Sequence, residues 1–220
     1  MTLLIGPAAW ADTSAFTLGS VLTNQPPSFT GTKGWAFINY GAGSYIGITQ
    51  LGVFDSGGDG LANPHDIGLW ALDGTLLAST TIPAGTAAPL VDGYRYMPIT
   101  PVWIPAGSLT NFNSKAIIAA EYSASDVDDL LTPQTGGYAA GLDAVIFQGA
   151  PSYGRFGFGT GLPFPNRPRS APDPEGSYGA PFWEVNFQFT VPEPSVPLLL
   201  APGLLYLFVS HRYRKRNKRN

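Results

Sequence analysis

The stretch with the most suggestive chemistry is acidic and glycine-rich and covers residues 55–66, DSGGDGLANPHD. Counting Asp55 as position 1 places Asp59 at position 5 and Asp66 at position 12. This is the ligand spacing of a calcium-binding loop, apart from glycine at position 3 and aspartate in place of glutamate at position 12. The three carboxylates and the Leu61 carbonyl supply several of the oxygen ligands that calcium needs, so Ca²⁺ is the candidate cofactor. A plain turn is the competing interpretation, because the flanks have strand-like patterns and Asp-Gly-rich loops commonly connect strands.

Nucleophilic and acid–base catalysis have little support in the sequence. His65 is the only histidine outside the basic C-terminus, and no G-x-S-x-G motif accompanies it to form a serine-based triad. The chain has no cysteine, which excludes disulfides, thiolate metal sites and cysteine nucleophiles. One acidic group has the paired carboxylates of a glycosidase: Asp126, Asp128 and Asp129. A short helix over 125–131 explains this group better, since acidic residues favour a helix N-terminus. We therefore expect a protein that is not an enzyme.

Aromatic side chains suggest a second kind of chemistry, which is stacking on sugar rings. The chain has 5 Trp and 10 Tyr, and several Trp residues fall in strand-like segments: Trp35, Trp70, Trp103 and Trp183. An exposed line of aromatic side chains would indicate a carbohydrate-binding module, whereas buried ones would simply fill a core. The sequence leaves both interpretations open.

The elements that position these residues are predicted to be short β-strands. The alternation is clearest over 183–191, where Trp183, Val185 and Phe187 face one way while Glu184 and Asn186 face the other, as in a half-buried strand. Further strands are expected over 35–40, 45–54, 67–72, 75–82, 94–99, 116–122 and 143–147. We expect a two-residue hairpin turn at Asp73-Gly74, a bulge near Gln50 and a long loop over 149–181.

Composition supports an all-β fold. The chain has 27 Gly and 21 Pro among 220 residues, only 12% charged residues and 44% hydrophobic residues, which is enough to form a core with many turns. We expect a β-sandwich over 12–190, either jelly-roll or Ig-like, with long Gly/Pro-rich loops. Residues 1–210 hold six basic and fifteen acidic residues, a net charge of −9, so nucleic acid is not an expected partner.

The two ends of the chain have targeting patterns. Residues 1–11 are almost wholly apolar and end in Ala-Trp-Ala before Asp12, which fits a signal-peptide cleavage site. A basic n-region and about half the usual length are missing, so we interpret 1–11 as part of a signal peptide that starts further upstream. An apolar first strand is the alternative.

The C-terminal segment 191–220 has three parts in order. Pro192-Glu193-Pro194 comes first, and an uncharged run over 196–209 follows. The tail over 211–220 follows and holds six of the twelve basic residues of the chain: Arg212, Arg214, Lys215, Arg216, Lys218 and Arg219. As a helix the run would span about 21 Å, short of a hydrocarbon core of roughly 30 Å, and snorkelling basic side chains close part of the gap. We predict a transmembrane helix with the tail in the cytoplasm.

A Pro-Glu-Pro tripeptide, a short apolar helix and a basic C-terminus together resemble the PEP-CTERM sorting signal of bacterial surface proteins. The resemblance covers about 30 residues. It implies export, transient anchoring in the inner membrane, and recognition near Pro192, Glu193 and Pro194 by an exosortase, a membrane-embedded cysteine transpeptidase. The body weakly resembles, over about residues 30–125, a β-sandwich domain of unknown function from secreted bacterial proteins, which implies an extracellular setting.

The leading hypothesis is therefore a non-enzymatic, exported bacterial protein that an exosortase sorts to the cell surface or the exopolysaccharide matrix. The alternatives are a carbohydrate-binding module that acts on matrix polysaccharide and an anchored glycan hydrolase. A C-terminal anchor that is never cleaved remains open as well.

Overall fold

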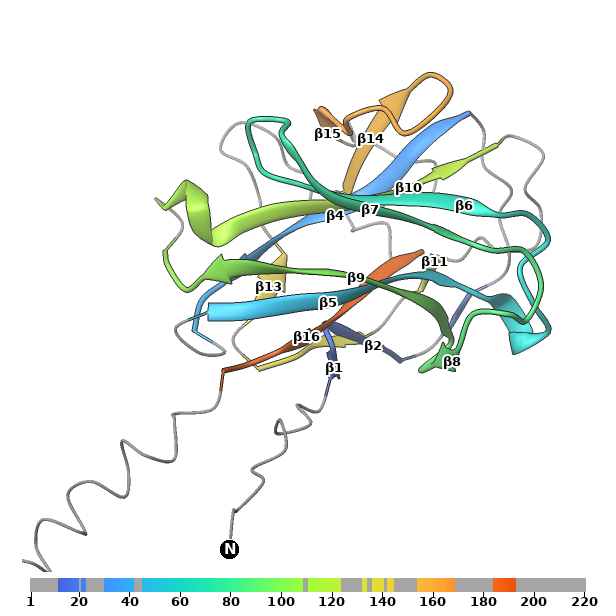
Figure 1. The fold of residues 1–220 in the computed structure, drawn as a ribbon, viewed down its shortest axis with the longest axis horizontal. Coiled ribbons are helices and arrows are strands. Elements are labelled where there is room, and N and C mark those ends of the chain that lie inside the picture. Colours follow the sequence, from blue (N-terminus) through green and yellow to red (C-terminus); the bar gives the residue numbers. More distant parts are fainter. Residues whose placement is uncertain are drawn as a thin grey trace, which may run out of the picture.

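A computed structural model describes residues 12–19, 21–22, 30–41, 45–108, 111–123, 132–133, 136–140, 142–144, 154–168 and 184–192. These residues form two antiparallel sheets stacked as two layers (Figure 1). The all-β prediction is thereby confirmed, and the arrangement is that of a β-sandwich. Within the described ranges the helical segments are two short 3₁₀ turns, η1 (Ser56–Gly58) and η2 (Phe112–Ser114).

Each sheet combines strands that are distant in the sequence. The first has the order β1 (Thr13–Ser14), β16 (Val185–Thr190), β5 (Tyr45–Phe54), β9 (Tyr94–Pro105) and β8 (Leu90–Val91). The second has the order β15 (Arg167–Pro168), β14 (Gly154–Phe158), β4 (Gly31–Asn39), β10 (Lys115–Tyr122), β6 (His65–Trp70) and β7 (Leu76–Ile82), and β13 (Leu142–Ala144) also pairs with β4. Two small ladders pair β2 (Phe16–Leu18) with β12 (Gly136–Tyr138) and β3 (Val21–Leu22) with β11 (Thr132–Pro133).

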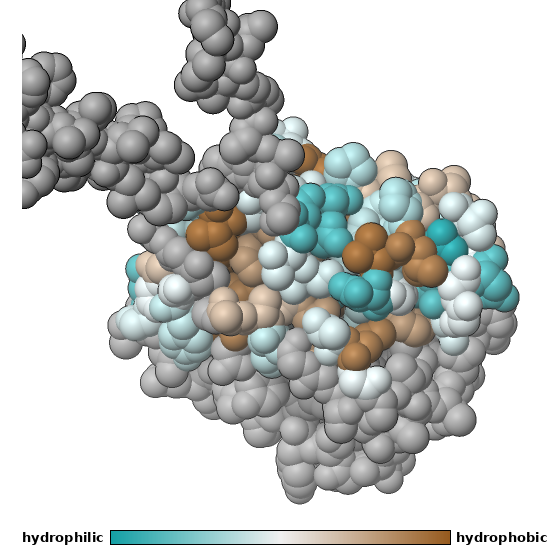
Figure 2. Space-filling view, turned by 90° about the horizontal axis from the view of Figure 1, so that it is seen from below, coloured by the Kyte–Doolittle hydropathy of each residue, from teal (hydrophilic) through white to brown (hydrophobic). Residues whose placement is uncertain are grey.

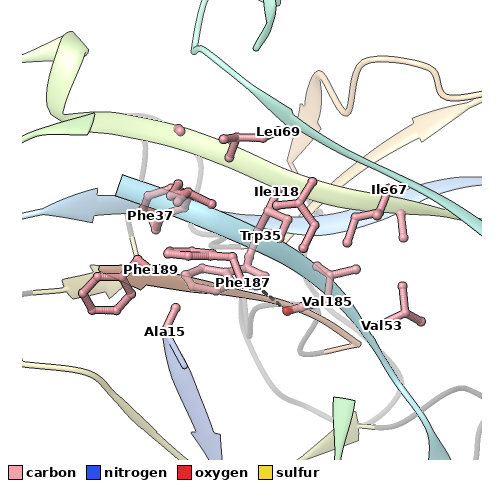
Figure 3. Packing of buried hydrophobic residues seen from close by; sticks show 14 of the residues in the cluster. Ala15, Trp35, Phe37, Val53, Ile67, Leu69, Ile118, Val185, Phe187 and Phe189 are labelled. Carbon is pink, nitrogen blue, oxygen red and sulfur yellow. Dashed lines mark hydrogen bonds between the residues drawn. The ribbon is translucent and has the colours of Figure 1, made fainter. Parts of the chain in front are cut away.

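The core lies between the layers and is centred on aromatic side chains (Figure 3). Trp35 of β4 stacks on Phe187 of β16, with ring centroids 5.9 Å apart, and Phe37 lies 4.5 Å from the same ring. The indole N–H of Trp35 donates to the Val185 carbonyl across the interface at 2.9 Å. Apolar burial and this hydrogen bond together hold β4 against β16.

Most predicted strands are confirmed with shifts in their ends, the largest at β9, which continues six residues beyond the predicted 94–99. The predicted bulge is confirmed by a register shift between Ile48 and Gln50. The hairpin at Asp73-Gly74 is also present, but its turn is not the two-residue type. Gly74 N–H donates to Ala71 O at 3.1 Å and Ala71 N–H donates to Thr75 O at 2.9 Å, so the loop is one residue longer. Only Gly74 of the pair has a positive φ, +92°, whereas a two-residue type I′ turn needs two.

Two further predictions are wrong. Residues 149–181 were expected to form a loop, yet β14 lies within them and pairs with β4 from Gly154↔Trp35 to Phe158↔Gly31. The backbones of β4 and β14 come so close there that a Cβ on Gly31 would lie 2.0 Å from the Gly157 carbonyl oxygen. This close approach explains the glycine at position 31.

The second error concerns β16, which was expected to be half-buried and is buried on both faces. The Asn186 side chain donates to Phe16 O at 2.7 Å and accepts from Phe16 N–H at 3.2 Å, so the N-terminal segment covers the polar face.

The chain enters and leaves the sandwich at one place. β1 pairs with β16 through Thr13↔Phe189, and Thr190 pairs with Gly47 near the start of β5. The start of β5, the end of β9 and the end of β16 lie on the same side of the molecule, at the left in Figure 1. The predicted helix over 125–131, the predicted signal-peptide residues 1–11 and the segment from Glu193 onward lie outside the described residues.

Candidate functional site

The predicted calcium loop is organised around an ion pair that the sequence reasoning missed. Asp55 follows β5, and its Oδ2 lies 2.7 Å from Nε of Arg95 on β9, with the two side chains 0% and 6% exposed respectively. The remaining guanidinium N–H groups donate to the carbonyl oxygens of Gly58 (2.9 Å), Ala88 (2.9 Å) and Thr86 (3.3 Å). Arg95 therefore joins the loop after β5 to the segment before β8.

A glycine completes this arrangement. The Gly60 N–H donates to both Asp55 carboxylate oxygens, at 3.2 and 3.1 Å, and Gly60 has φ of +115°. A Cβ at this position would lie 2.8 Å from the Gly85 backbone, so only glycine fits the close approach of the two loops. The Asp55 carboxylate is thus held by one cation and one backbone donor.

Two of the other predicted calcium ligands make different contacts, and the third is exposed. Asp59 is exposed, and the Leu61 carbonyl accepts from Gly85 N–H at 2.7 Å. Asp66 lies on β6, where its Oδ1 accepts from Thr81 Oγ1 at 2.5 Å across the β6–β7 ladder. No group of three His, Cys, Asp or Glu side chains with metal-binding geometry is found among the described residues. Calcium binding stays a prediction, and the Asp55–Arg95 pair is the structural alternative to it.

His65 is the first residue of β6 and is buried. Its Nδ1 lies 2.8 Å from the Glu121 carbonyl, which can only accept, so Nδ1 carries the proton in this contact. The ring also packs on Tyr122 at a centroid distance of 4.9 Å. These contacts give His65 a packing role between β6 and β10.

The tryptophans divide into buried and exposed ones. Trp35 and Trp70 are 0% and 2% exposed and belong to the interior, whereas Trp103 on β9 is 46% exposed. Trp103 borders an open groove of about 620 Å³ between β7 and β9, together with Leu72, Leu77, Asn113 and Lys115. Trp183 lies outside the described residues.

Several other large apolar or aromatic side chains are exposed. They are Tyr40, Tyr45, Leu76, Leu77, Leu90, Val91 and Phe158. On the described part of the face seen in Figure 2, apolar residues form separate groups with hydrophilic residues between them. The surface is therefore patchy, and the chemistry of each group has to be considered separately.

The predicted sorting residues are only partly described. Pro192 is the last described residue and is half-buried, while Glu193, Pro194 and the basic tail lie outside. The acidic group Asp126, Asp128 and Asp129 lies outside as well. The helices that the structure describes include none long and apolar enough to cross a membrane.

Comparison with known proteins does not add a family. No protein-family model, no curated protein and no solved structure matches the chain.

Proposed function

We propose that this chain is a non-enzymatic, exported bacterial protein that is sorted to the cell surface or the exopolysaccharide matrix and cleaved near Pro192, Glu193 and Pro194 by an exosortase. The observation that carries the proposal is the order of three sequence features directly after the last strand. The Pro-Glu-Pro tripeptide begins two residues after Thr190, and the apolar run and the basic tail follow it. Each part alone has little specificity, but the order and place are those of a sorting signal.

The position of the last strand supports cleavage without loss of the fold. β16 lies between β1 and β5, and its Phe187 and Phe189 belong to the core, so the domain needs the chain as far as Thr190. A cut after Pro194 removes none of the described strands. The sorting enzyme can therefore release a folded domain.

The proposal also includes the type of sandwich and the membrane segment that follows it. The chain changes sheets from β4 to β5, from β5 to β6, from β7 to β8 and from β9 to β10, which is typical of a jelly-roll or Ig-like sandwich and not of a simple meander. Residues 196–209 form a transmembrane helix, and the tail beginning at Arg212 stays in the cytoplasm by the positive-inside rule. The protein is then held in the inner membrane until it is processed.

The test is the intact mass of the chain recovered from its native host, compared between inner membrane, cell surface and medium. We expect surface and medium forms that end near Pro194, with or without an attached group. If every copy retains the residues through Asn220, the segment is a permanent anchor and the proposal is wrong.

The chain contains its own matched control. Pro172-Asp173-Pro174 repeats the Pro-acidic-Pro pattern upstream of the proposed signal. Glu193→Ala should leave the full-length form in the inner membrane, whereas Asp173→Ala should be processed like the wild type. Equal processing of both variants would show that Glu193 is not recognised.

A further inference from the structure

Three exposed aromatic side chains lie at the end of the sandwich from which the chain leaves. Tyr40, Tyr45 and Trp103 are 44%, 49% and 46% exposed, and we name them the aromatic end. Tyr40 follows β4, Tyr45 begins β5, and Trp103 is close to the end of β9. Exposed apolar side chains that gather in one place mark a surface for contact with another molecule or a membrane, whereas isolated ones need no explanation.

Tyr45 and Trp103 lie on the same outer face of the first sheet. Tyr45 pairs with Pro105 and Gly47 pairs with Trp103, so the two aromatic side chains are diagonal neighbours across the β5–β9 ladder. The Trp103 ring lies over Gly47, because a Cβ there would be 2.8 Å from a ring carbon. The glycine at position 47 thus leaves room for the Trp103 ring on the sheet surface.

Tyr40 is fixed at the same end through its neighbour Asn39. The Asn39 side chain donates to the Ile104 carbonyl at 3.1 Å, and Asn39 O accepts from Gly107 N–H at 2.9 Å. These hydrogen bonds join the end of β4 to the end of β9. The three aromatic residues therefore lie at the same end of the sandwich, with Tyr40 after a strand of the second sheet and Tyr45 and Trp103 on the first.

The proposed membrane segment starts close to this end. Thr190 pairs with Gly47, the residue under the Trp103 ring, and only residues 193–195 separate Pro192 from the apolar run over 196–209. Four residue steps cover at most about 14 Å of extended chain. Anchoring therefore holds Pro192 within that distance of the start of the apolar run and keeps the neighbouring aromatic end near the bilayer surface, where even a weak contact is favoured by its high effective concentration.

On this basis, and on the proposed anchoring by residues 196–209, we propose that the aromatic end docks on the lipid headgroup region of the membrane that holds the chain. Tyr and Trp are the side chains that favour this interface, because their rings are apolar and carry a polar group. Docking orients the sandwich with the Asp55–Arg95 loops away from the bilayer. It also keeps Pro192, Glu193 and Pro194 at the surface, where a membrane-embedded enzyme can reach them.

The experiment uses the full chain in vesicles of phosphatidylethanolamine and phosphatidylglycerol. Because the chain has no cysteine, single cysteines can carry an environment-sensitive fluorophore without background labelling. Ser108→Cys reports on the aromatic end, and Val91→Cys reports on the far end; both residues are exposed. We expect a blue-shifted emission and quenching by lipid-borne quenchers at position 108, and aqueous quenching at position 91. The double variant Tyr45→Ser/Trp103→Ser should lose the lipid signal at position 108 while the chain still floats with the vesicles.

The possible failures are distinguishable. If the chain floats with the vesicles but the label at position 108 remains open to an aqueous quencher, docking is wrong and anchoring stands. If the chain does not float, both proposals fail together. If the label is aqueous and responds instead to added xylan or dextran, the aromatic end is a polysaccharide platform and the membrane proposal is overturned. Thermal melts of the double variant confirm that it is folded.

Discussion

Replacing Asp55 with asparagine tests whether the loop over 55–66 is built around the Asp55–Arg95 ion pair. Asparagine keeps the volume and can still accept from Gly60 N–H, but it leaves the buried guanidinium without a counter-charge. Both side chains are nearly inaccessible, at 0% and 6% exposure, so water cannot replace the carboxylate. Removing one partner of a buried pair costs about 3–5 kcal/mol, because the remaining charge stays desolvated. That is a large part of a typical domain stability of about 5–15 kcal/mol.

The assay is urea unfolding of four proteins: wild type, Asp55→Asn, Arg95→Met and the double variant. Each single variant should lose about 4 kcal/mol, which corresponds to a fall in melting temperature of about 12 °C for a domain of this size. The double variant should be no less stable than either single one, since it leaves no isolated charge. The resulting coupling energy measures the pair.

The same proteins separate the ion pair from calcium binding. If the pair alone organises the loop, the wild-type melt is unchanged by chelator or by added Ca²⁺. If Asp55 binds calcium, added Ca²⁺ stabilises the wild type and this gain disappears in Asp55→Asn. A loss below about 1 kcal/mol in Asp55→Asn, or additive losses in the double variant, would refute the reasoning from burial.

Three smaller predictions concern packing and backbone geometry. Burial raises the pKa of the Tyr94 and Tyr96 phenols above the ordinary value of 10.0, so their contribution to stability is complete below pH 10 and is lost as the pH rises further. Phenylalanine at either position should flatten the fall in urea midpoint between pH 9 and pH 11. Gly34→Ala should cost about 3 kcal/mol or more by thermal melt, because its Cβ would overlap the Ile118 carbonyl oxygen. Gly93→Ala should cost about 1–2 kcal/mol by the same measurement, since Gly93 has φ of +84°.

Strand positions could be predicted because a strand with one buried face alternates apolar and polar residues along the sequence. Residues 45–54 coincide with β5, and the break in apolar phase there located the bulge near Gln50. Turn types were harder to predict, because Asp-Gly occurs three times, at 59–60, 73–74 and 92–93. At Asp92-Gly93 both residues have positive φ and connect the Val91↔Tyr94 pair, so the two-residue turn that the sequence predicts at Asp73-Gly74 is found here instead.

The residues that the sequence analysis missed act through tertiary contacts. Arg95 lies in a strand and pairs with a carboxylate 40 positions away in the sequence. The local sequence pattern around either residue therefore gives no sign of this contact. Asn186 occupies a position that the alternation assigns to solvent. It is buried because the N-terminal segment folds over β16, where the Asn186 side chain hydrogen-bonds the Phe16 backbone. A charged residue in an otherwise apolar strand was the one available signal for Arg95, because such residues are rarely buried without a partner.

The direction of the strands gives the two ends of the sandwich different chemistry. β5 runs from Tyr45 to Phe54, so the acidic loop that follows it falls at one end and the aromatic residue that begins it falls at the other. β16 is antiparallel to β5, and the chain must therefore leave at the Tyr45 end, away from the Asp55–Arg95 pair. A signal placed directly after such a strand is separated from the loops at the far end by the length of the sheet. We accordingly expect substitutions at Asp55 to change stability and substitutions at Glu193 to change processing, with each leaving the other property intact in protein that remains folded.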